Sequence, residues 1–418
     1  MTKNKSIYFI LFIIFLSLIL SFYLAEDTLG GGKMDYNYHT KYFFHFSEDF
    51  NDAYNKFGLD QESNSVRNSP VFYMFFSIFL KLGFTLKNLK IINILIIFPM
   101  LVFFLKCLEI KYPNIDVKTK IYFSSALLLS PTIRTMIAWP YPLLWALCFF
   151  LISLYFFLIF KKTNNFKDKI NFAYCNVFFL SLSSYFTPNF AFFSIFFLYN
   201  FYIVFKFQKE IFKIILLNLI LATPAIYFLV TKDFYLFNSE VYQIDASIKY
   251  NLSNKIIIIS SMLLLFFLPF ISKKNFFDNY KKITINFNLF ILLLFIFTNI
   301  YFYNFLPNAG GGIFYHLSHF LFKNSSILFV IFFFTLCLFR YFNLYNLNNI
   351  LLFIILVFYN LQFTIYYKYF DPLMFFLFLF LVKFNNEINI KINILSKKYL
   401  LFYAVFLVMN FSKSLIDY

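Results

Sequence analysis

The chain has 418 residues, of which 61% are hydrophobic and 13% are charged, and 72 of them are Phe. Apolar runs long enough to cross about 30 Å of hydrocarbon as helices recur almost from end to end, which excludes an ordinary soluble protein. The roughly ten-residue alternation of membrane β-strands is absent. The sequence therefore predicts an all-α, polytopic membrane protein.

The net charge of +17 could indicate nucleic-acid binding. The lysines, however, lie in short loops between apolar runs, as the positive-inside rule predicts, so we expect no nucleic-acid partner. The four cysteines fall within or beside apolar runs and form no CxxC pair, so neither a disulfide framework nor a zinc site is predicted. No cofactor is indicated, although a divalent metal remains compatible with the sequence.

The first apolar run, at about 6–24, follows Lys3 and Lys5 and lacks a small-residue cleavage site. It is predicted to be an uncleaved signal anchor whose N-terminus lies in the cytoplasm. The next stretch, 25–69, carries eight acidic and four basic residues. Its acidic balance favours the outer side of the membrane.

Whether the run 70–86 crosses the membrane decides on which side every later loop lies. If it crossed the membrane, five later loops rich in lysine would lie outside, against the positive-inside rule. It opens with Ser69-Pro70 and closes near Gly83, which is compatible with a helix lying in or on the outer leaflet. We predict that this run does not cross.

Twelve further spans are expected, which gives thirteen spans with the C-terminus outside and one membrane domain over 1–418. These spans are predicted at about 91–107, 121–133, 143–160, 170–186, 189–206, 211–230, 255–272, 283–303, 325–340, 349–366, 371–384 and 399–413.

Asp35 is the first candidate for chemistry, because a carboxylate near the outer membrane surface can accept a proton from an acceptor hydroxyl. The preceding glycines, 30–32, would let the backbone approach a ligand closely. Tyr38 and His39 follow within four residues and are candidates for substrate contact. The alternative is that Asp35 is a solvated loop acid, one of eight in this stretch.

Two arginines near the outer face are candidate phosphate ligands, because a guanidinium binds phosphate with two parallel hydrogen bonds. Arg134 lies in the segment 130–140, whose Trp139 and Pro140 could equally be an interfacial anchor and a turn. Arg67 lies just before the run 70–86, where an ordinary interfacial arginine is the alternative.

The late segment Tyr366–Pro372 adds Lys368, which could meet a lipid phosphate or simply extend toward the membrane surface. Asp371 could pair with this lysine, but a residue before proline also fits a helix start. The loop 307–319 contains a glycine run and His316, and would suit a substrate-contacting loop. His316 and His319 have a spacing that metals tolerate, yet no third ligand lies nearby in the sequence.

Together these features resemble the GT-C superfamily of membrane glycosyltransferases, which includes mannosyl- and arabinosyltransferases that use polyprenyl-phosphate sugars. The resemblance lies in a first span followed by an external loop with an acid, in the Pro-aromatic helix that begins at Ser69-Pro70, in the Ser130–Pro140 loop and in the Tyr369–Pro372 corner. It covers roughly residues 1–210. It implies a first external loop at 25–90, the rest of a core at 91–210 and variable helices at 211–418.

The resemblance implies that Asp35 deprotonates the acceptor and that Arg134 and Lys368 hold the donor phosphate. Transfer with inversion at the sugar would take place at the outer face of a bacterial plasma membrane. Many members carry a pair of acids where this chain has one, which argues against a metal-dependent reaction. A lipid-linked glycan flippase or transporter and a polysaccharide polymerase or ligase are the alternatives.

Overall fold

Helices form all the regular secondary structure in the computed structural model, which describes residues 2–57, 68–232, 252–271, 287–305, 310–342, 344–360, 365–384 and 391–416. The predicted all-α fold is confirmed for these residues. The chain divides into two compact units, Met1–Val241 with Ile392–Tyr418, and Tyr242–Lys391. We call them unit 1 and unit 2 and describe each by itself.

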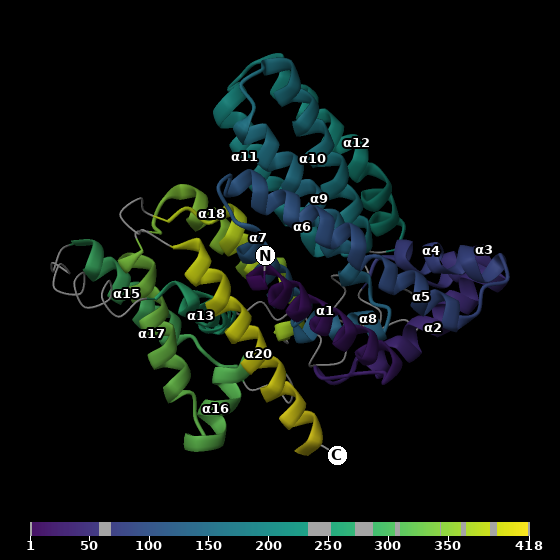
Figure 1. Cartoon of the computed structure of the whole chain (residues 1–418). Coiled ribbons are helices and arrows are strands. Elements are labelled where there is room, and N and C mark those ends of the chain that lie inside the picture. Colours follow the sequence, from purple (N-terminus) through teal and green to yellow (C-terminus); the bar gives the residue numbers. More distant parts are fainter. Residues whose placement is uncertain are drawn as a thin grey trace. The chain divides into compact units, whose positions relative to one another are not determined.

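Among the described residues, unit 1 contains twelve α-helices, a 3₁₀ turn and the late helix α20 (Figure 1). Their bounds are α1 Thr2–Tyr23, α2 Gly32–Glu48, α3 Phe50–Lys56, α4 Pro70–Lys81, α5 Leu86–Leu95, α6 Ile97–Lys111, α7 Val117–Leu128, α8 Pro131–Ala138, α9 Pro142–Lys162, α10 Phe166–Phe186, η2 Pro188–Phe192, α11 Phe193–Phe205, α12 Lys209–Thr231 and α20 Ile392–Ile416.

Six helical segments within the described residues are long and apolar enough to cross a membrane, and a seventh is added if the bent pair α7 and α8 counts as one span. The six are Leu86–Lys111, Pro142–Lys162, Pro188–Phe205, Lys209–Thr231, Leu252–Phe270 and Ile392–Ser412. The structure thus supports a multi-pass membrane protein, while the number thirteen stays a prediction.

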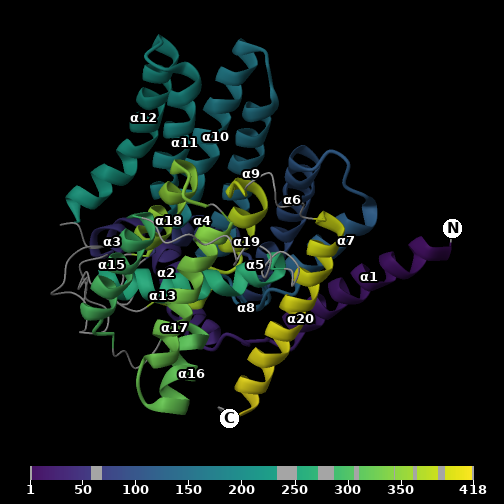
Figure 2. The same cartoon turned by 90° about the vertical axis from the view of Figure 1, so that its left-hand side faces the viewer.

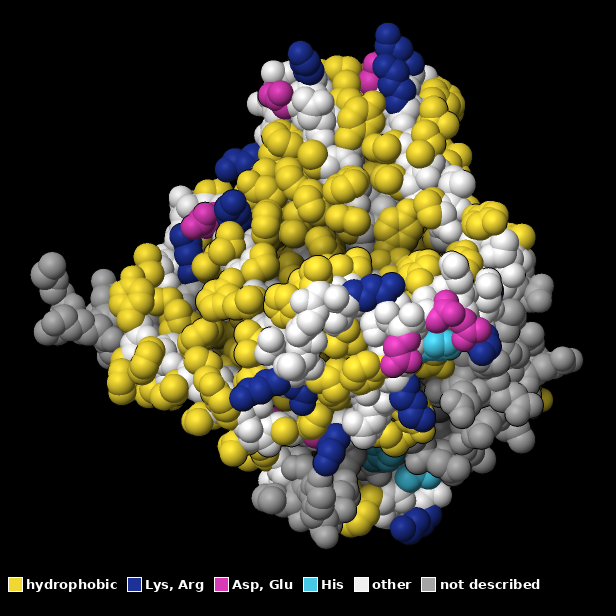
Figure 3. Space-filling view, turned by 90° about the vertical axis from the view of Figure 1, so that its right-hand side faces the viewer, with side chains coloured by type: hydrophobic (Ala, Val, Ile, Leu, Met, Phe, Trp, Pro, Cys, Tyr) yellow, Lys and Arg dark blue, Asp and Glu magenta, His cyan; other side chains and the backbone are white. Residues whose placement is uncertain are grey.

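The helices α9–α12 stand side by side in both views of the ribbon (Figures 1 and 2). Hydrophobic side chains cover most of the visible face of this part of the molecule, and lysines gather at its upper end (Figure 3). Almost none of the apolar stretch of α12 is buried inside the protein. So much exposed apolar surface is expected against hydrocarbon and not against water.

The chain directions in unit 1 place two loops at one end of this bundle. The helices α9 and α10 run antiparallel, since the Ser183 hydroxyl donates to the Ala146 carbonyl at 2.7 Å and the Asn176 amide donates to the Ser153 carbonyl at 2.9 Å. The loop 161–169 joins them at one end, and the Phe205 ring at the end of α11 lies 5.5 Å from the Phe166 ring at the start of α10. The loops 161–169 and 206–213 therefore lie at the same end, which we call the lysine-rich end.

The helices α2, α3 and α4 lie at the opposite end of unit 1, which we call the α2 end. The Lys232 ammonium, just after α12, donates to the Asn55 carbonyl in α3 at 2.7 Å. The Phe75 ring of α4 lies 4.8 Å from the Trp145 ring in the first turn of α9. The segment 25–90, which contains α2, α3 and α4, thus covers the end of the helices α9–α12 that is opposite the lysine-rich end.

The helix α4 is shorter than the run 70–86 suggested. The Ser69 hydroxyl accepts from the Val71 amide and Pro70 occupies the first helical position, a favourable start. After Lys81 the Phe84 amide donates to the Phe79 carbonyl at 3.0 Å, and Gly83 adopts φ +86°. This is a left-handed glycine stop, and it leaves a helix about 18 Å long, shorter than the hydrocarbon core.

A bend of 59° separates α7 from α8. The Ser130 hydroxyl accepts from the Ile133 amide at 3.3 Å and Pro131 is the first residue of α8. A cap followed by proline starts a new helix instead of continuing the old one. The span expected over 121–133 therefore ends at Leu128, and residues 131–138 form a separate buried helix.

Unit 2 is built around α13, which packs against the neighbouring helices of this unit. Its elements are α13 Leu252–Phe267, η4 Leu268–Phe270, α15 Phe287–Tyr301, α16 Gly312–Phe322, α17 Ser326–Tyr341, α18 Leu347–Tyr359, η5 Tyr367–Tyr369, α19 Leu373–Phe376 and the π-helical turn η6 Leu377–Leu381. The π turn interrupts the apolar stretch expected to span 371–384.

Candidate functional site

The start of α2 is fixed by a side-chain cap from outside the helix. The Asp27 carboxylate accepts from the backbone amides of Gly32 and Lys33 at 2.9 and 3.0 Å. A carboxylate at this end also interacts favourably with the helix dipole. A Cβ on Gly32 would lie 2.6 Å from the Thr135 methyl group, so only glycine lets α2 begin this close to α8.

Asp35 lies in the first turn of α2 and is partly buried. The residues on either side of it alternate in environment, because Tyr36 is buried and Met34 is 61% exposed. Burial raises the pKa of the Tyr73 phenol in α4, and the nearby Tyr42 and Asp35 raise it further. Asp35 therefore lies at the boundary between the packed helices and the surface.

His39 is buried under α4 and does not face solvent. Its Nδ1 lies 3.0 Å from the Tyr73 hydroxyl, and its ring packs edge-on against Phe72 at 5.7 Å and Tyr141 at 5.2 Å. Tyr38, in contrast, is 38% exposed. Of these two candidates for substrate contact, Tyr38 is accessible to a substrate, whereas His39 is packed against Phe72, Tyr73 and Tyr141.

A second group of side chains consists of Lys90, Trp139 and Tyr36. The Lys90 ammonium sits 3.8 Å from the centroid of the Trp139 ring and 4.8 Å from that of Tyr36. The two rings are 5.7 Å apart. Burial raises the pKa of the Tyr36 phenol to about 12, so this phenol keeps its proton near neutral pH and is able to donate a hydrogen bond.

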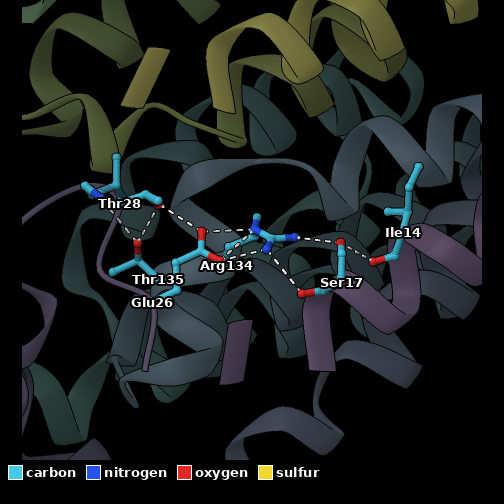
Figure 4. A network of polar contacts seen from close by, with 7 residues as sticks. Ile14, Ser17, Glu26, Thr28, Arg134 and Thr135 are labelled. Carbon is cyan, nitrogen blue, oxygen red and sulfur yellow. Dashed lines mark hydrogen bonds and ion pairs between the residues drawn. The ribbon is translucent and has the colours of Figure 1, made fainter. Parts of the chain in front are cut away.

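Arg134 is buried in an ion pair, as Figure 4 shows. Its Nη2 donates to Glu26 Oε2 at 2.7 Å and its Nε donates to both carboxylate oxygens. Its Nη1 donates to the Ser17 hydroxyl at 3.0 Å. The pair joins α8 to the end of α1, and each side chain is 5% exposed. In this arrangement these guanidinium donors bond to protein groups. Phosphate binding by Arg134 stays a prediction.

The remaining predicted residues are placed elsewhere or not at all. Arg67 lies outside the described residues. Lys368 lies in η5 of unit 2, 5.6 Å from the Tyr366 ring centroid and 5.8 Å from that of Tyr369. His316 is exposed on α16, beside the Tyr315 ring at 5.3 Å. The structure therefore brings Asp35, Tyr38, His39 and Arg134 into unit 1 and Lys368 and His316 into unit 2.

The glycine run 310–312 shapes the start of α16 in unit 2. Gly311 adopts φ +89° before α16, and its amide donates to the Ile365 carbonyl at 2.9 Å. His319 contacts the Tyr315 ring and lies 3.3 Å from the Ser325 hydroxyl. In the part of the chain that the structure describes, no three His, Cys, Asp or Glu residues gather as a metal would require.

An exposed ion cluster supports the far end of α2. The Asp52 carboxylate lies 2.8 Å from His45 Nε2 and 2.9 Å from the Lys56 ammonium. The hydrogen bonds from His45 and from Lys56 lower the pKa of Asp52 below its ordinary value of 3.8. Asp52 therefore favours the folded state when it is ionised.

This lowered pKa predicts a loss of stability in acid. The contribution of Asp52 is present above about pH 4 and disappears as the pH falls through its lowered pKa. The difference in thermal unfolding midpoint between wild type and Asp52→Asn should therefore shrink between pH 5 and pH 3, measured in detergent. A gap that stays constant over that interval would contradict the assignment.

No protein-family model, no curated protein and no solved structure matches this chain.

Several members of the α2 end were not singled out by sequence reasoning. Glu26 was only one of eight acids, Lys90 was only the end of a loop, and Tyr73 lay inside an apolar run. One signal was available: Gly32, Tyr36 and His39 recur at a helical spacing. Such a stripe predicts a buried face on 32–48, with its flanking residues at the edges.

Proposed function

We propose that the chain is a multi-pass membrane glycosyltransferase that moves a sugar from a polyprenyl-phosphate donor to a lipid, glycan or protein acceptor. The observation that supports this most directly is the position of Asp35. Its carboxylate is partly buried on a helix at the end of unit 1 remote from the lysine-rich loops, which is the end where a membrane-bound donor would be met from outside.

The charge distribution supports this sidedness. The loops 161–169 and 206–213 are rich in lysine, and the positive-inside rule assigns them to the cytoplasm. The α2 end then faces the periplasm or the exterior of a bacterial plasma membrane. A polyprenyl phosphate cannot leave the bilayer, so its headgroup must be processed at this depth.

The helix α4 then lies at the outer interface and does not cross. Tyr73 in its first turn contacts His39, and Lys90, nine residues beyond the end of α4, lies on the Trp139 ring. His39 and Trp139 both belong to the α2 end, so the chain enters and leaves α4 at the same end of unit 1. Its Phe72 and Phe76 pack on Phe43 of α2.

This topology predicts a labelling pattern for single cysteines. Leu82 is 68% exposed just after α4, so Leu82→Cys should react with a membrane-impermeant maleimide in intact cells. Glu48→Cys should react equally, and Lys209→Cys only after permeabilisation, because it lies at the lysine-rich end. The native cysteines are replaced first. Labelling of residue 82 with the pattern of residue 209 would show that α4 crosses.

In the proposed reaction Asp35 takes the proton of an acceptor hydroxyl while the acceptor oxygen attacks the anomeric carbon. The bond from that carbon to the phosphate oxygen breaks, and its electron pair stays on the phosphate. Attack opposite the leaving group inverts the configuration. The leaving group is already a stabilised anion, so a base and cations that neutralise the phosphate are the main requirements.

A carrier for lipid-linked glycans is the second candidate, and one observation favours it. Lys255 is 2% exposed in α13, inside a candidate span, and its ammonium donates to the Asn360 carbonyl. Ionisable groups within spans often mark transport pathways. Purified protein in vesicles would separate the two functions: sugar transfer from a polyprenyl-phosphate hexose to an acceptor supports the enzyme, and movement of intact lipid-linked sugar without transfer supports the carrier.

A further inference from the structure

The two edges of the buried face of α2 carry opposite charges. Gly32, Tyr36 and His39 lie on the inner face at spacings of four and three residues, and helical geometry places Lys33 on one edge and Asp35 on the other. Tyr36 lies toward the Lys33 edge of this face, and the Lys90 ammonium lies 4.8 Å from the Tyr36 ring centroid. Lys33 and Lys90 are therefore on the same side of α2.

The Lys90 ammonium is held over aromatic faces. It lies 3.8 Å from the Trp139 ring centroid and 4.8 Å from the Tyr36 centroid, which is a favourable place for a cation. The nearby Asp27 carboxylate accepts from the backbone amides of Gly32 and Lys33. The Lys90 ammonium is thus a cation held over Tyr36 in the first turns of α2, where the Asp27 carboxylate is already engaged by two backbone amides.

The same rings carry two buried donors that find no acceptor. The Tyr36 hydroxyl and the Trp139 indole nitrogen are buried and make no hydrogen bond within the described residues. Tyr36 is 5% exposed and Trp139 is 8% exposed. The Trp139 carbon next to that nitrogen would lie 3.2 Å from a Cβ on Gly32, and the Asp27 carboxylate oxygen 2.9 Å from it, so the pyrrole edge borders the start of α2 near Asp27. Buried donors of this kind usually have an acceptor.

We propose that Lys33, Lys90, Tyr36 and Trp139 form the site for the phosphate of a lipid-linked monophosphate. This inference rests on the proposed function and names the phosphate site for it. Arg134, one of the two arginines that the sequence suggested as phosphate ligands, directs its donors to Glu26 and Ser17. The two lysines and two ring donors supply the positive charge and the hydrogen bonds that a phosphate needs.

The pair of lysines fits the change in charge during transfer. The phosphate in the donor is a diester with one negative charge. When the bond to the anomeric carbon breaks, the electron pair stays on oxygen, and the phosphate becomes a monoester that carries close to two charges near pH 7. Two ammonium groups therefore match the leaving group better than the donor, which favours bond breaking.

The tryptophans give a direct readout of this site. The chain contains two tryptophans, and the Trp145 indole donates to Asn93 at 3.0 Å, apart from the site. In a Trp145→Phe background Trp139 is the source of all tryptophan fluorescence. Titration with a polyprenyl monophosphate in phosphatidylcholine nanodiscs should change this fluorescence saturably, and phosphatidylglycerol or inorganic phosphate should bind at least about tenfold more weakly.

Lys90→Met should weaken that binding at least about tenfold, as expected for loss of a charge-assisted contact. Lys33→Gln should do the same. Lys87→Gln is the matched control, because Lys87 is an exposed lysine of the same helix, and it should bind like the parent. Equal losses in Lys87→Gln and Lys90→Met, or equal binding of phosphatidylglycerol and polyprenyl monophosphate, would reduce the effect to general surface charge and overturn the proposal.

This test is independent of sugar transfer, because it needs neither acceptor nor turnover. Asp35→Asn should bind the polyprenyl monophosphate as well as the parent does. Normal binding by Lys90→Met together with active transfer by the parent would overturn the phosphate site and leave the proposed function intact. Tight, Lys90-dependent binding without any transfer would support the phosphate site and count against the glycosyltransferase.

Discussion

Asp35→Asn should lower the rate of sugar transfer about 10²–10⁴-fold, the usual contribution of a general base. Asparagine keeps the size of the side chain and its position in the first turn of α2, but it cannot accept the proton. The measurement is the initial rate of transfer from a polyprenyl-phosphate hexose by purified protein in lipid. Expression level and unfolding midpoint should stay those of the wild type, because the carboxylate is only partly buried.

Glu48→Gln is the matched control for Asp35→Asn. Glu48 is the last residue of the same helix and is exposed, so the substitution removes one acid of the first loop with little change in packing. Its transfer rate should remain within about twofold of the wild type, since a distant surface charge has a small effect. Undiminished transfer by Asp35→Asn would show that Asp35 is not the general base. Equal losses of transfer rate in both variants would show that the rate depends on the total charge of this loop.

Glu26→Gln should destabilise unit 1 by about 3–5 kcal/mol, the range for breaking a buried ion pair by removal of one partner. The substitution leaves the Arg134 guanidinium, 4% exposed, without its counter-charge between α1 and α8. The expected result is a large fall in the thermal unfolding midpoint in detergent. Lys120→Gln at the more exposed pair with Glu109 should change stability by less than about 1 kcal/mol.

The Glu26 variant also separates two roles for Arg134. If the guanidinium only joins α8 to the end of α1, Glu26→Gln and Arg134→Gln should lose transfer in proportion to their loss of folded protein. If it binds the donor phosphate, Arg134→Gln should weaken donor binding in the fraction that remains folded, whereas Glu26→Gln should not. Donor titrations on protein selected by size-exclusion chromatography would distinguish these results.

The position of α4 shows how far charge counting can go. The loop charges predicted that the run 70–86 does not cross, and the chain enters and leaves α4 at the same end of unit 1. The sequence could not fix where this helix ends. Gly83 was visible as a break, but whether it stops the helix depends on the left-handed turn it adopts and on the aromatic packing of Phe72 and Phe76 against α2.

Arg134 illustrates the opposite case. An arginine at an outer loop after Ser130-Pro131 suggested a phosphate ligand, and its spacing from Glu26, 108 residues earlier, carries no signal in a single sequence. The bend between α7 and α8 turns this loop inward and buries it against α1. The pairing is a consequence of tertiary packing, which periodicity cannot predict.

The sequence by itself determined the solvent in which this chain folds, the helical character of its segments and the side on which its lysines gather. These follow from composition and from short-range geometry, because backbone groups in hydrocarbon must bond within a helix. Only the tertiary structure decided which groups surround Lys90. Its ammonium lies over the rings of Tyr36 and Trp139, and this contact depends on how α2, α5 and α8 pack, a property of side-chain shapes that no local pattern records.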